Sequence, residues 1–98
     1  MKTIALISEE YNTNAALWQF DKVMAAIAFD LDLTIVFLNK GIQQLQLNQA
    51  WKCLNIYGIT SIYVISDEHK DIADCQIKFK KLNMVEFKRL ISQSEFLL

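Results

Sequence analysis

Three stretches of the chain are almost entirely apolar: Lys2–Ile7, Leu33–Leu38 and Thr60–Ile65. Unbroken runs of Ile, Val, Leu and Phe differ from the alternating pattern of a half-exposed strand, and they are typical of strands that are covered on both faces. Such strands belong to parallel sheets that lie between helices. We therefore interpret the three runs as neighbouring strands of one parallel sheet.

Between these strands, the apolar residues follow a helical spacing. It predicts a helix from about Ala15 to Phe29, with a core-facing stripe formed by Leu17, Phe20, Met24, Ile27 and Leu31. A short helical or irregular piece follows at Ile42–Leu47, and a second helix covers Asn48–Tyr57 until Gly58 ends it. Near the other end of the chain, Asn83 and Glu86 form a capping box that opens a helix over Met84–Ser92.

Two further strands complete the pattern. Gln76–Lys80 alternates polar and apolar residues, which predicts a more exposed fourth strand, and Glu95–Leu98 predicts a short fifth one. Strands that alternate with helices indicate the α/β class. We expect residues 1–98 to form a single three-layer α/β/α domain with a mainly parallel five-stranded sheet.

The apolar fraction of this small chain is high. Of its 98 residues, 53% are apolar, whereas about 45–50% is usual for a soluble domain. A subunit interface is the natural place for such a surplus. On the first helix, Trp18, Lys22, Ala25 and Phe29 gather about 150° from the predicted core stripe, at about 100° per residue. We predict that these four residues form an interface.

Charge and hydropathy exclude two classes of partner. The formal net charge is −1, so the chain lacks the basic footprint of a protein that binds nucleic acid directly. The apolar run Thr3–Ile7 is too short for a signal peptide, and no stretch approaches the roughly 20 apolar residues of a membrane span. We expect a cytoplasmic protein whose cysteines stay reduced.

The residues that usually carry chemistry are few. Gly41 and Gly58 are the only glycines, so neither a dinucleotide fingerprint nor a P-loop can be built. His69 is the single histidine, and Cys53 and Cys75 form no CxxC motif, which argues against zinc-ribbon and thioredoxin sites. We expect no cofactor and no metal.

Neither cysteine stands where an active thiol is expected. Cys53 flanks the apolar stripe of the second helix, which is formed by Leu47, Ala50, Trp51 and Leu54. A packing role is the simplest interpretation of that position. Cys75 lies at the amino end of the predicted fourth strand, whereas ligands of such sheets meet the carboxyl ends. The loops at those carboxyl ends, Ser8–Asn14, Asn39–Gly41 and Ser66–Lys70, are expected to line a shared cleft or a partner contact.

Several blocks of the chain resemble TusC/DsrF proteins of the DsrE/F-like family. They cover nearly the whole length of the chain and include Ile4-Ala5, the block from Ala25 to Leu38, Gly41–Leu45, Trp51–Ile59, and the tail with Leu82, Phe87, Leu90 and Phe96–Leu98. The resemblance implies the DsrE-like fold. It also implies a place beside TusB-like and TusD-like subunits in a dimer of heterotrimers, which passes persulfide sulfur through a downstream carrier toward 2-thiouridine at the tRNA wobble position.

The resemblance also implies where the relay cysteine of related subunits stands, at the carboxyl end of the third strand. This chain has Tyr63-Val64-Ile65-Ser66 there, and the Ile65 side chain cannot become a thiolate. We therefore expect a non-catalytic accessory subunit. The alternatives are a persulfide carrier that uses Cys53 or Cys75, a DsrF-type subunit in dissimilatory sulfur oxidation, and an α/β module that binds a small anionic ligand. Self-association of the isolated chain is a further possibility.

Overall fold

The computed structural model describes residues 2–65, 79–94 and 96–97. Four strands form a parallel sheet: β1 (Lys2–Ile7), β2 (Asp32–Leu38), β3 (Ile62–Ile65) and β4 (Lys80–Leu82). The two residues of β5 (Phe96–Leu97) pair in parallel with the amino half of β1. The resulting order is β4-β3-β2-β1-β5, so β1, β2 and β3 lie in the interior of the sheet.

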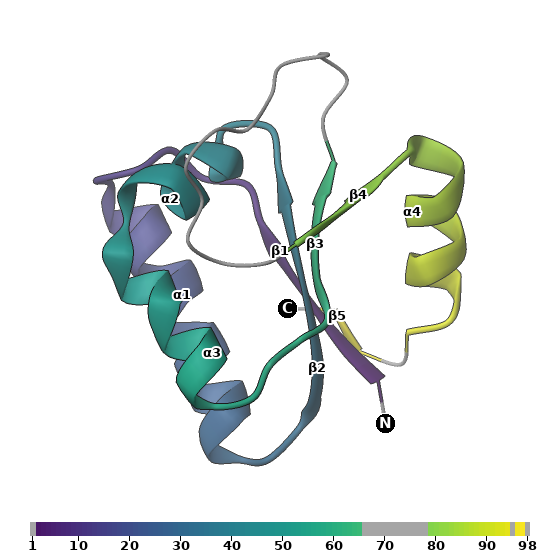
Figure 1. Ribbon diagram of the computed structural model, residues 1–98, viewed down its shortest axis with the longest axis horizontal. Helices are drawn as coiled ribbons and strands as arrows, with labels where there is room; N and C mark the ends of the chain where they lie inside the picture. Colours follow the sequence, from purple (N-terminus) through teal and green to yellow (C-terminus); the bar gives the residue numbers. More distant parts are fainter. Residues whose placement is uncertain (1, 66–78, 95, 98) are drawn as a thin grey trace.

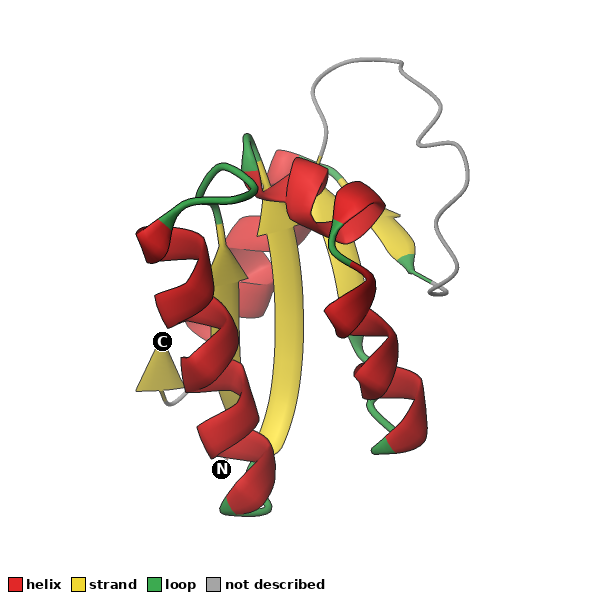
Figure 2. Ribbon diagram, turned by 90° about the vertical axis from the view of Figure 1, so that its left-hand side faces the viewer, coloured by secondary structure: helices red, strands yellow, loops and turns green. Residues whose placement is uncertain are grey.

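Helices lie on both faces of this sheet. One face carries α1 (Asn14–Ala28), α2 (Gly41–Leu47), the 3₁₀ turn η1 (Gln49–Lys52) and α3 (Cys53–Ile56), whereas α4 (Met84–Ser92) covers the other (Figure 1). Figure 2 shows α1 and α3 side by side in the same layer. No helix in the described part of the chain combines the length and the apolarity that crossing a membrane requires.

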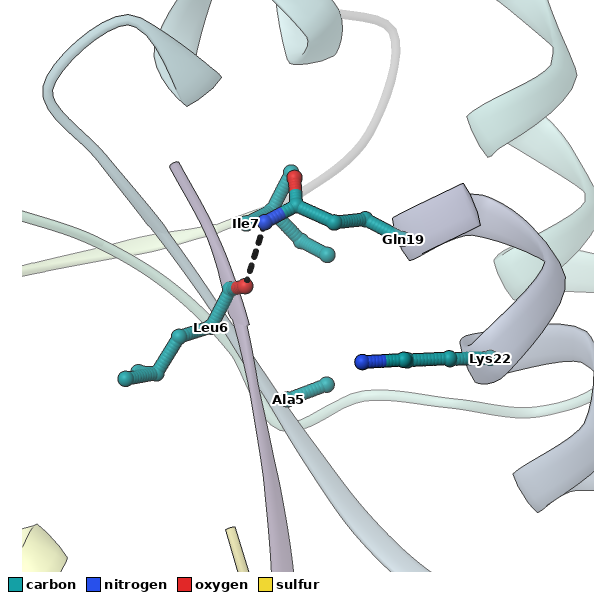
Figure 3. Close-up of a pocket in the computed structure, with 5 residues that line it drawn as sticks. All are labelled: Ala5, Leu6, Ile7, Gln19 and Lys22. Carbon is teal, nitrogen blue, oxygen red and sulfur yellow. Dashed lines mark hydrogen bonds between the residues drawn. The ribbon is translucent and has the colours of Figure 1, made fainter. Parts of the chain in front are cut away.

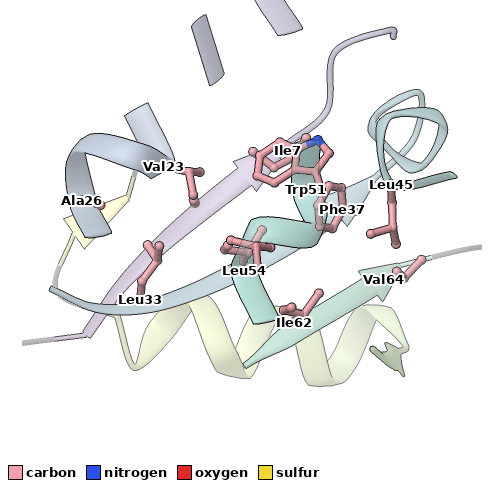
Figure 4. Packing of buried hydrophobic residues seen from close by; sticks show 12 residues of the cluster. Ile7, Val23, Ala26, Leu33, Phe37, Leu45, Trp51, Leu54, Ile62 and Val64 are labelled. Carbon is pink, nitrogen blue, oxygen red and sulfur yellow. The ribbon is translucent and has the colours of Figure 1, made fainter. Parts of the chain in front are cut away.

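The larger core lies between the sheet and the three-helix layer (Figure 4). Trp51 is its largest fully buried side chain. Its ring meets Phe20 of α1 and Phe37 of β2 edge to face, with ring centroids 4.9 and 5.2 Å away. Such T-shaped pairs are a favoured aromatic geometry, which adds to the free energy of burial. Trp51 therefore joins η1, α1 and the sheet.

A smaller core lies under α4. Phe87 of this helix packs with Ile4, Val36 and Ile65. The side chains of β2 thus enter both cores in turn, because Ile35 and Phe37 belong to the larger cluster and Val36 to the smaller one. This confirms the interpretation of the unbroken apolar run as a strand that is covered on both faces.

Most of the predicted elements are present. The bounds of β1 and α4 agree with the prediction, and Asn83 and Glu86 form the predicted capping box, with Glu86 N donating to Asn83 Oδ1 at 2.8 Å. The α/β class with a parallel sheet and helices on both faces is confirmed.

Three boundaries were predicted wrongly. The predicted helix Asn48–Tyr57 is a 3₁₀ turn followed by α3, because Asn48 Oδ1 accepts from Ala50 N at 3.0 Å and starts a tight turn. Strand β3 begins two residues later than Thr60. Strand β4 occupies Lys80–Leu82 and shares only Lys80 with the predicted Gln76–Lys80, of which residues 76–78 lie outside the described part.

The core-facing stripe of α1 was also placed wrongly at its ends. Leu17 is 61% exposed and Leu31 is 40% exposed, whereas Phe20, Met24 and Ile27 do pack against the core. The side chains of α1 that are fully buried are smaller: Ala16, Val23 and Ala26. Small residues let the helix backbone approach the sheet, so the contact is centred on them and the large residues flank it.

Candidate functional site

The first loop at the carboxyl edge of the sheet is shaped by its own polar residues. Asn12 has a φ of 67°, in the left-handed region that Asn tolerates better than most residues. Thr13 caps α1, since its Oγ1 accepts from Ala16 N at 3.1 Å and donates to Glu10 O at 2.8 Å. The chain therefore reverses from β1 into α1 through an ordered turn.

The second loop brings α2 against the end of β1. Asn39 adopts a φ of 53° directly after β2, and Gly41 then begins the helix. A Cβ atom on Gly41 would lie 1.8 Å from Ile7 O and 2.8 Å from Ser8 N. Only a residue without a side chain permits this approach of the α2 backbone to the β1 backbone.

Two glutamine side chains join these loops below the surface. Gln44 Nε2 donates to Glu9 O at 2.7 Å and to Gln19 Oε1 at 3.3 Å, and Gln19 Oε1 also accepts from Glu9 N at 3.2 Å. Gln19 Nε2 in turn donates to Leu6 O at 3.2 Å. The pair thus ties α1 and α2 to the end of β1.

Gln44 is the more deeply buried member of the pair. Its side chain is fully buried, and its Oε1 has no hydrogen-bond partner. Amides do not take up or release protons near neutral pH, so the pair positions the loops and does no acid–base chemistry. The sequence analysis missed both residues, because no local pattern distinguishes a buried glutamine from an exposed one.

Two cavities are lined in part by residues of α1. The smaller, about 90 Å³, is lined by Ala5, Leu6 and Ile7 of β1 and by Gln19 and Lys22 of α1 (Figure 3). In this view the Lys22 side chain extends from α1 toward β1. Strand β5 pairs with Thr3 and Ile4 of β1. Farther along β1, the carbonyl of Leu6 accepts a hydrogen bond from the side-chain amide of Gln19 instead of from a neighbouring strand.

The larger cavity, about 270 Å³, opens between the first loop and the end of α2. It is lined by residues 11–14 together with Ala16, Leu17 and Asn48. The prediction was that three loops line a shared cleft or a partner contact, and this cavity bears on the first of the three loops. Residues 11–14 of the Ser8–Asn14 loop line it, whereas Asn39–Gly41 does not. The Ser66–Lys70 loop lies outside the described residues.

Cys53 begins α3 and faces α1. Its side chain is half-buried, and its Sγ lies 3.9 Å from Met24 Sδ. Burial raises the pKa of the Cys53 thiol above its ordinary value, which disfavours the thiolate that sulfur transfer requires. Cys75 and His69 lie outside the described residues.

The carboxyl end of β3 is apolar. Ile65 is 7% exposed and sits in register between Leu38 of β2 and Leu82 of β4. Its side chain packs with Val36 and Phe87 under α4. A hydrocarbon side chain therefore occupies the position that the resemblance assigns to a relay cysteine. In the described part of the chain, no three His, Cys, Asp or Glu side chains come close enough together to hold a metal ion.

The outer face of α1 presents all four predicted interface residues to solvent. Trp18 is 67% and Phe29 is 78% exposed, and Lys22 and Ala25 are exposed between them. The Lys22 ammonium lies 5.9 Å from the centroid of the Trp18 ring, within the range of a cation–π contact. Large exposed aromatic residues are enriched at protein interfaces.

Comparison with known proteins does not assign the chain to a family. No model of a protein family matches it, and no curated protein matches it either.

Proposed function

We propose that this chain is a non-catalytic subunit of a sulfur-relay complex of the TusBCD type, which serves 2-thiouridine formation at the tRNA wobble position in the cytoplasm. In this proposal the domain has the DsrE-like, five-stranded version of the α/β/α fold. It assembles with TusB-like and TusD-like subunits and contacts no nucleic acid itself. The order of strands and the helices on both faces of the sheet are compatible with that fold.

The observation that carries the proposal is the environment of Ile65. A persulfide relay passes sulfur when a thiolate of the acceptor attacks the outer sulfur of the donor's persulfide, so each carrier needs an accessible thiolate. The side chain at the end of β3 is instead a buried hydrocarbon. A subunit with this strand end can shape the assembly, but it cannot hand on sulfur from that position.

The state of Cys53 supports the same role. Its half-buried thiol faces Met24, and burial raises its pKa. A raised pKa lowers the thiolate fraction near neutral pH, and a neighbouring helix restricts the approach of a second protein. Both effects oppose the function of a carrier. The exposed aromatic residues of α1 supply the apolar surface that an assembling subunit needs.

The experiment replaces both cysteines with Ala and expresses the variant with the genes of the two candidate partner subunits. We expect a stable complex and an unchanged level of 2-thiouridine in tRNA, since neither thiol carries sulfur. The matched control removes the relay cysteine of the TusD-like subunit, which should abolish thiolation. A persulfide trapped on Cys53 or Cys75, together with loss of thiolation in the double variant, would refute the proposal. So would failure of the chain to join any such complex.

A further inference from the structure

The outer edge of β1 is paired over only part of its length. Strand β5 pairs with Thr3 and Ile4, and among the described residues no strand pairs with Ala5, Leu6 or Ile7 on that side. On the other side, β1 pairs with β2 as far as Ile7. Within the described structure, the carboxyl half of β1 is therefore an open strand edge.

The backbone groups of Leu6 point toward this open edge. In β2, Ile35 N donates to Ser61 O on the β3 side at 2.9 Å, so the backbone groups of the next residue, Val36, point toward β1. Val36 is in register with Leu6, and in a parallel ladder it bonds to the two neighbours of its register partner. The N–H and C=O groups of Leu6 itself therefore point away from β2.

This edge carries no charge of its own. Residues 3–7 are uncharged, and all except Thr3 are apolar. An open edge of this kind is a template for pairing with a strand of another chain. The opposite edge of the sheet differs, because β4 is only three residues long and exposes Lys80 and Lys81. Short edge strands and lysines are common means of preventing such pairing, and β1 needs an equivalent from another element.

Two side chains of α1 lie against the open part of the edge. Gln19 Nε2 donates to Leu6 O at 3.2 Å, so the carbonyl that an incoming strand would use is already bonded. Lys22 follows three residues later, extends toward β1 and lines the cavity of about 90 Å³ between α1 and the strand (Figure 3). An incoming strand would have to displace the amide and desolvate or displace the ammonium group, and both steps cost free energy.

The Gln19 amide is held in the orientation that this contact requires. Its Oε1 accepts from Glu9 N at 3.2 Å and from Gln44 Nε2 at 3.3 Å. Rotating the amide by half a turn would break both bonds, because it would set a donor against two donors. The direction of Nε2 toward Leu6 therefore follows from the bonds at the other end of the same group.

We propose that Gln19 and Lys22 protect the open part of the β1 edge, so that a strand of another chain does not pair with it. The amide occupies the acceptor at Leu6, and the ammonium group supplies the charge that β1 itself lacks. The role belongs to the chain by itself and does not depend on the sulfur-relay proposal.

The test compares two double variants of the full chain that have the same composition. Gln19→Met with Lys22→Met removes the protecting groups, whereas Lys40→Met with Gln43→Met makes the same replacements at exposed positions that do not line the cavity. Sedimentation velocity at rising concentration measures association, and amide hydrogen exchange followed by NMR shows where the chains meet. We expect the first variant to associate and the second to behave as the parent does.

The Leu6 amide identifies the surface of association, because its N–H points to the open edge. Its exchange in the Gln19→Met, Lys22→Met variant should slow as the concentration rises, by about tenfold once about nine-tenths of the chains are paired. Association through another surface would leave this rate unchanged. The single variant Lys22→Gln keeps the bonds of Gln19 and should show the same change at a higher concentration, so the test does not depend on the folding of the double variant. The proposal is overturned if the Leu6 amide exchanges at one rate at every concentration in both variants, or if the control changes as they do.

Discussion

Replacing each glycine with alanine should destabilise the domain for two different physical reasons. At Gly41 the obstacle is steric, because the new Cβ would lie 1.8 Å from Ile7 O and 2.4 Å from Ile7 C. At Gly58 the space is open, since nothing lies within 4 Å of a Cβ, but the φ of +73° is unfavourable for any residue with a side chain. The two sites therefore separate overpacking from backbone strain.

The magnitude at Gly41 follows from the geometry. To bring the Cβ–oxygen distance from 1.8 Å to the 3.0 Å that real Cβ contacts respect, α2 must move away from β1 by about 1.2 Å. Forced overpacking of this kind costs about 1–3 kcal/mol, and the better helix propensity of Ala returns at most about 1 kcal/mol. At Gly58 the left-handed conformation costs about 1–2 kcal/mol.

Thermal unfolding followed by circular dichroism measures both effects. In a domain of this size, about 1 kcal/mol shifts the Tm by roughly 4–8 °C, so each variant should melt clearly below the parent. Asn at position 58 should recover part of the loss, because Asn tolerates the left-handed region, whereas Asn at position 41 should be worse than Ala. A Gly41→Ala variant as stable as the parent would show that α2 does not press on β1, and the same rank order at both positions would refute the separation of the two causes.

Two further predictions concern the interior of the candidate site. The variant Gln44→Leu should loosen the first loop, because Gln19 loses the donor that orients its side chain. The hydrogen bond that is lost contributes about 1 kcal/mol, so exchange of the Glu9 amide hydrogen, measured by NMR, should accelerate several-fold. The control Gln43→Leu, on the exposed side of α2, should leave this exchange rate unchanged. In a Cys75→Ala background, iodoacetamide should modify Cys53 more slowly than a thiol of the unfolded chain at neutral pH, and the rate should rise as the pH approaches the raised pKa. Equal rates in the folded and unfolded chains would contradict the raised pKa of the thiol.

The strands were predictable because their signal is local. An unbroken run such as Leu33–Leu38 has no polar side to expose, so its coverage on both faces follows from composition alone. Strand β4 carries no such signal. Its residues Lys80 and Lys81 are exposed and only Leu82 turns toward a core, so its position depends on pairing with β3, which a single sequence does not encode locally.

The buried amides were not predictable for a related reason. Gln19 and Gln44 are 25 residues apart and meet only because α1 and α2 converge on the end of β1. Read singly, each is an ordinary polar residue on a helix. Gly41 carried a stronger signal, since a chain with only two glycines can be expected to use them where the backbone admits no other residue. That inference locates a close approach but not the segment approached.

The helix α1 shows why an apolar periodicity can indicate an interface and still misplace the core. Several sides of this helix carry apolar residues, so more than one stripe fits a 3.6-residue period. The stripe that was predicted to face the core is the one with the longest apolar side chains. Packing follows a different criterion, because Ala16, Val23 and Ala26 allow the closest approach to the sheet. Trp18 and Phe29 lie on the side of the helix that faces away from this contact, and both are exposed. Their exposure follows from the packing of small residues on the opposite side of the helix, and the same periodicity that misplaced the core stripe therefore located the exposed aromatic face correctly.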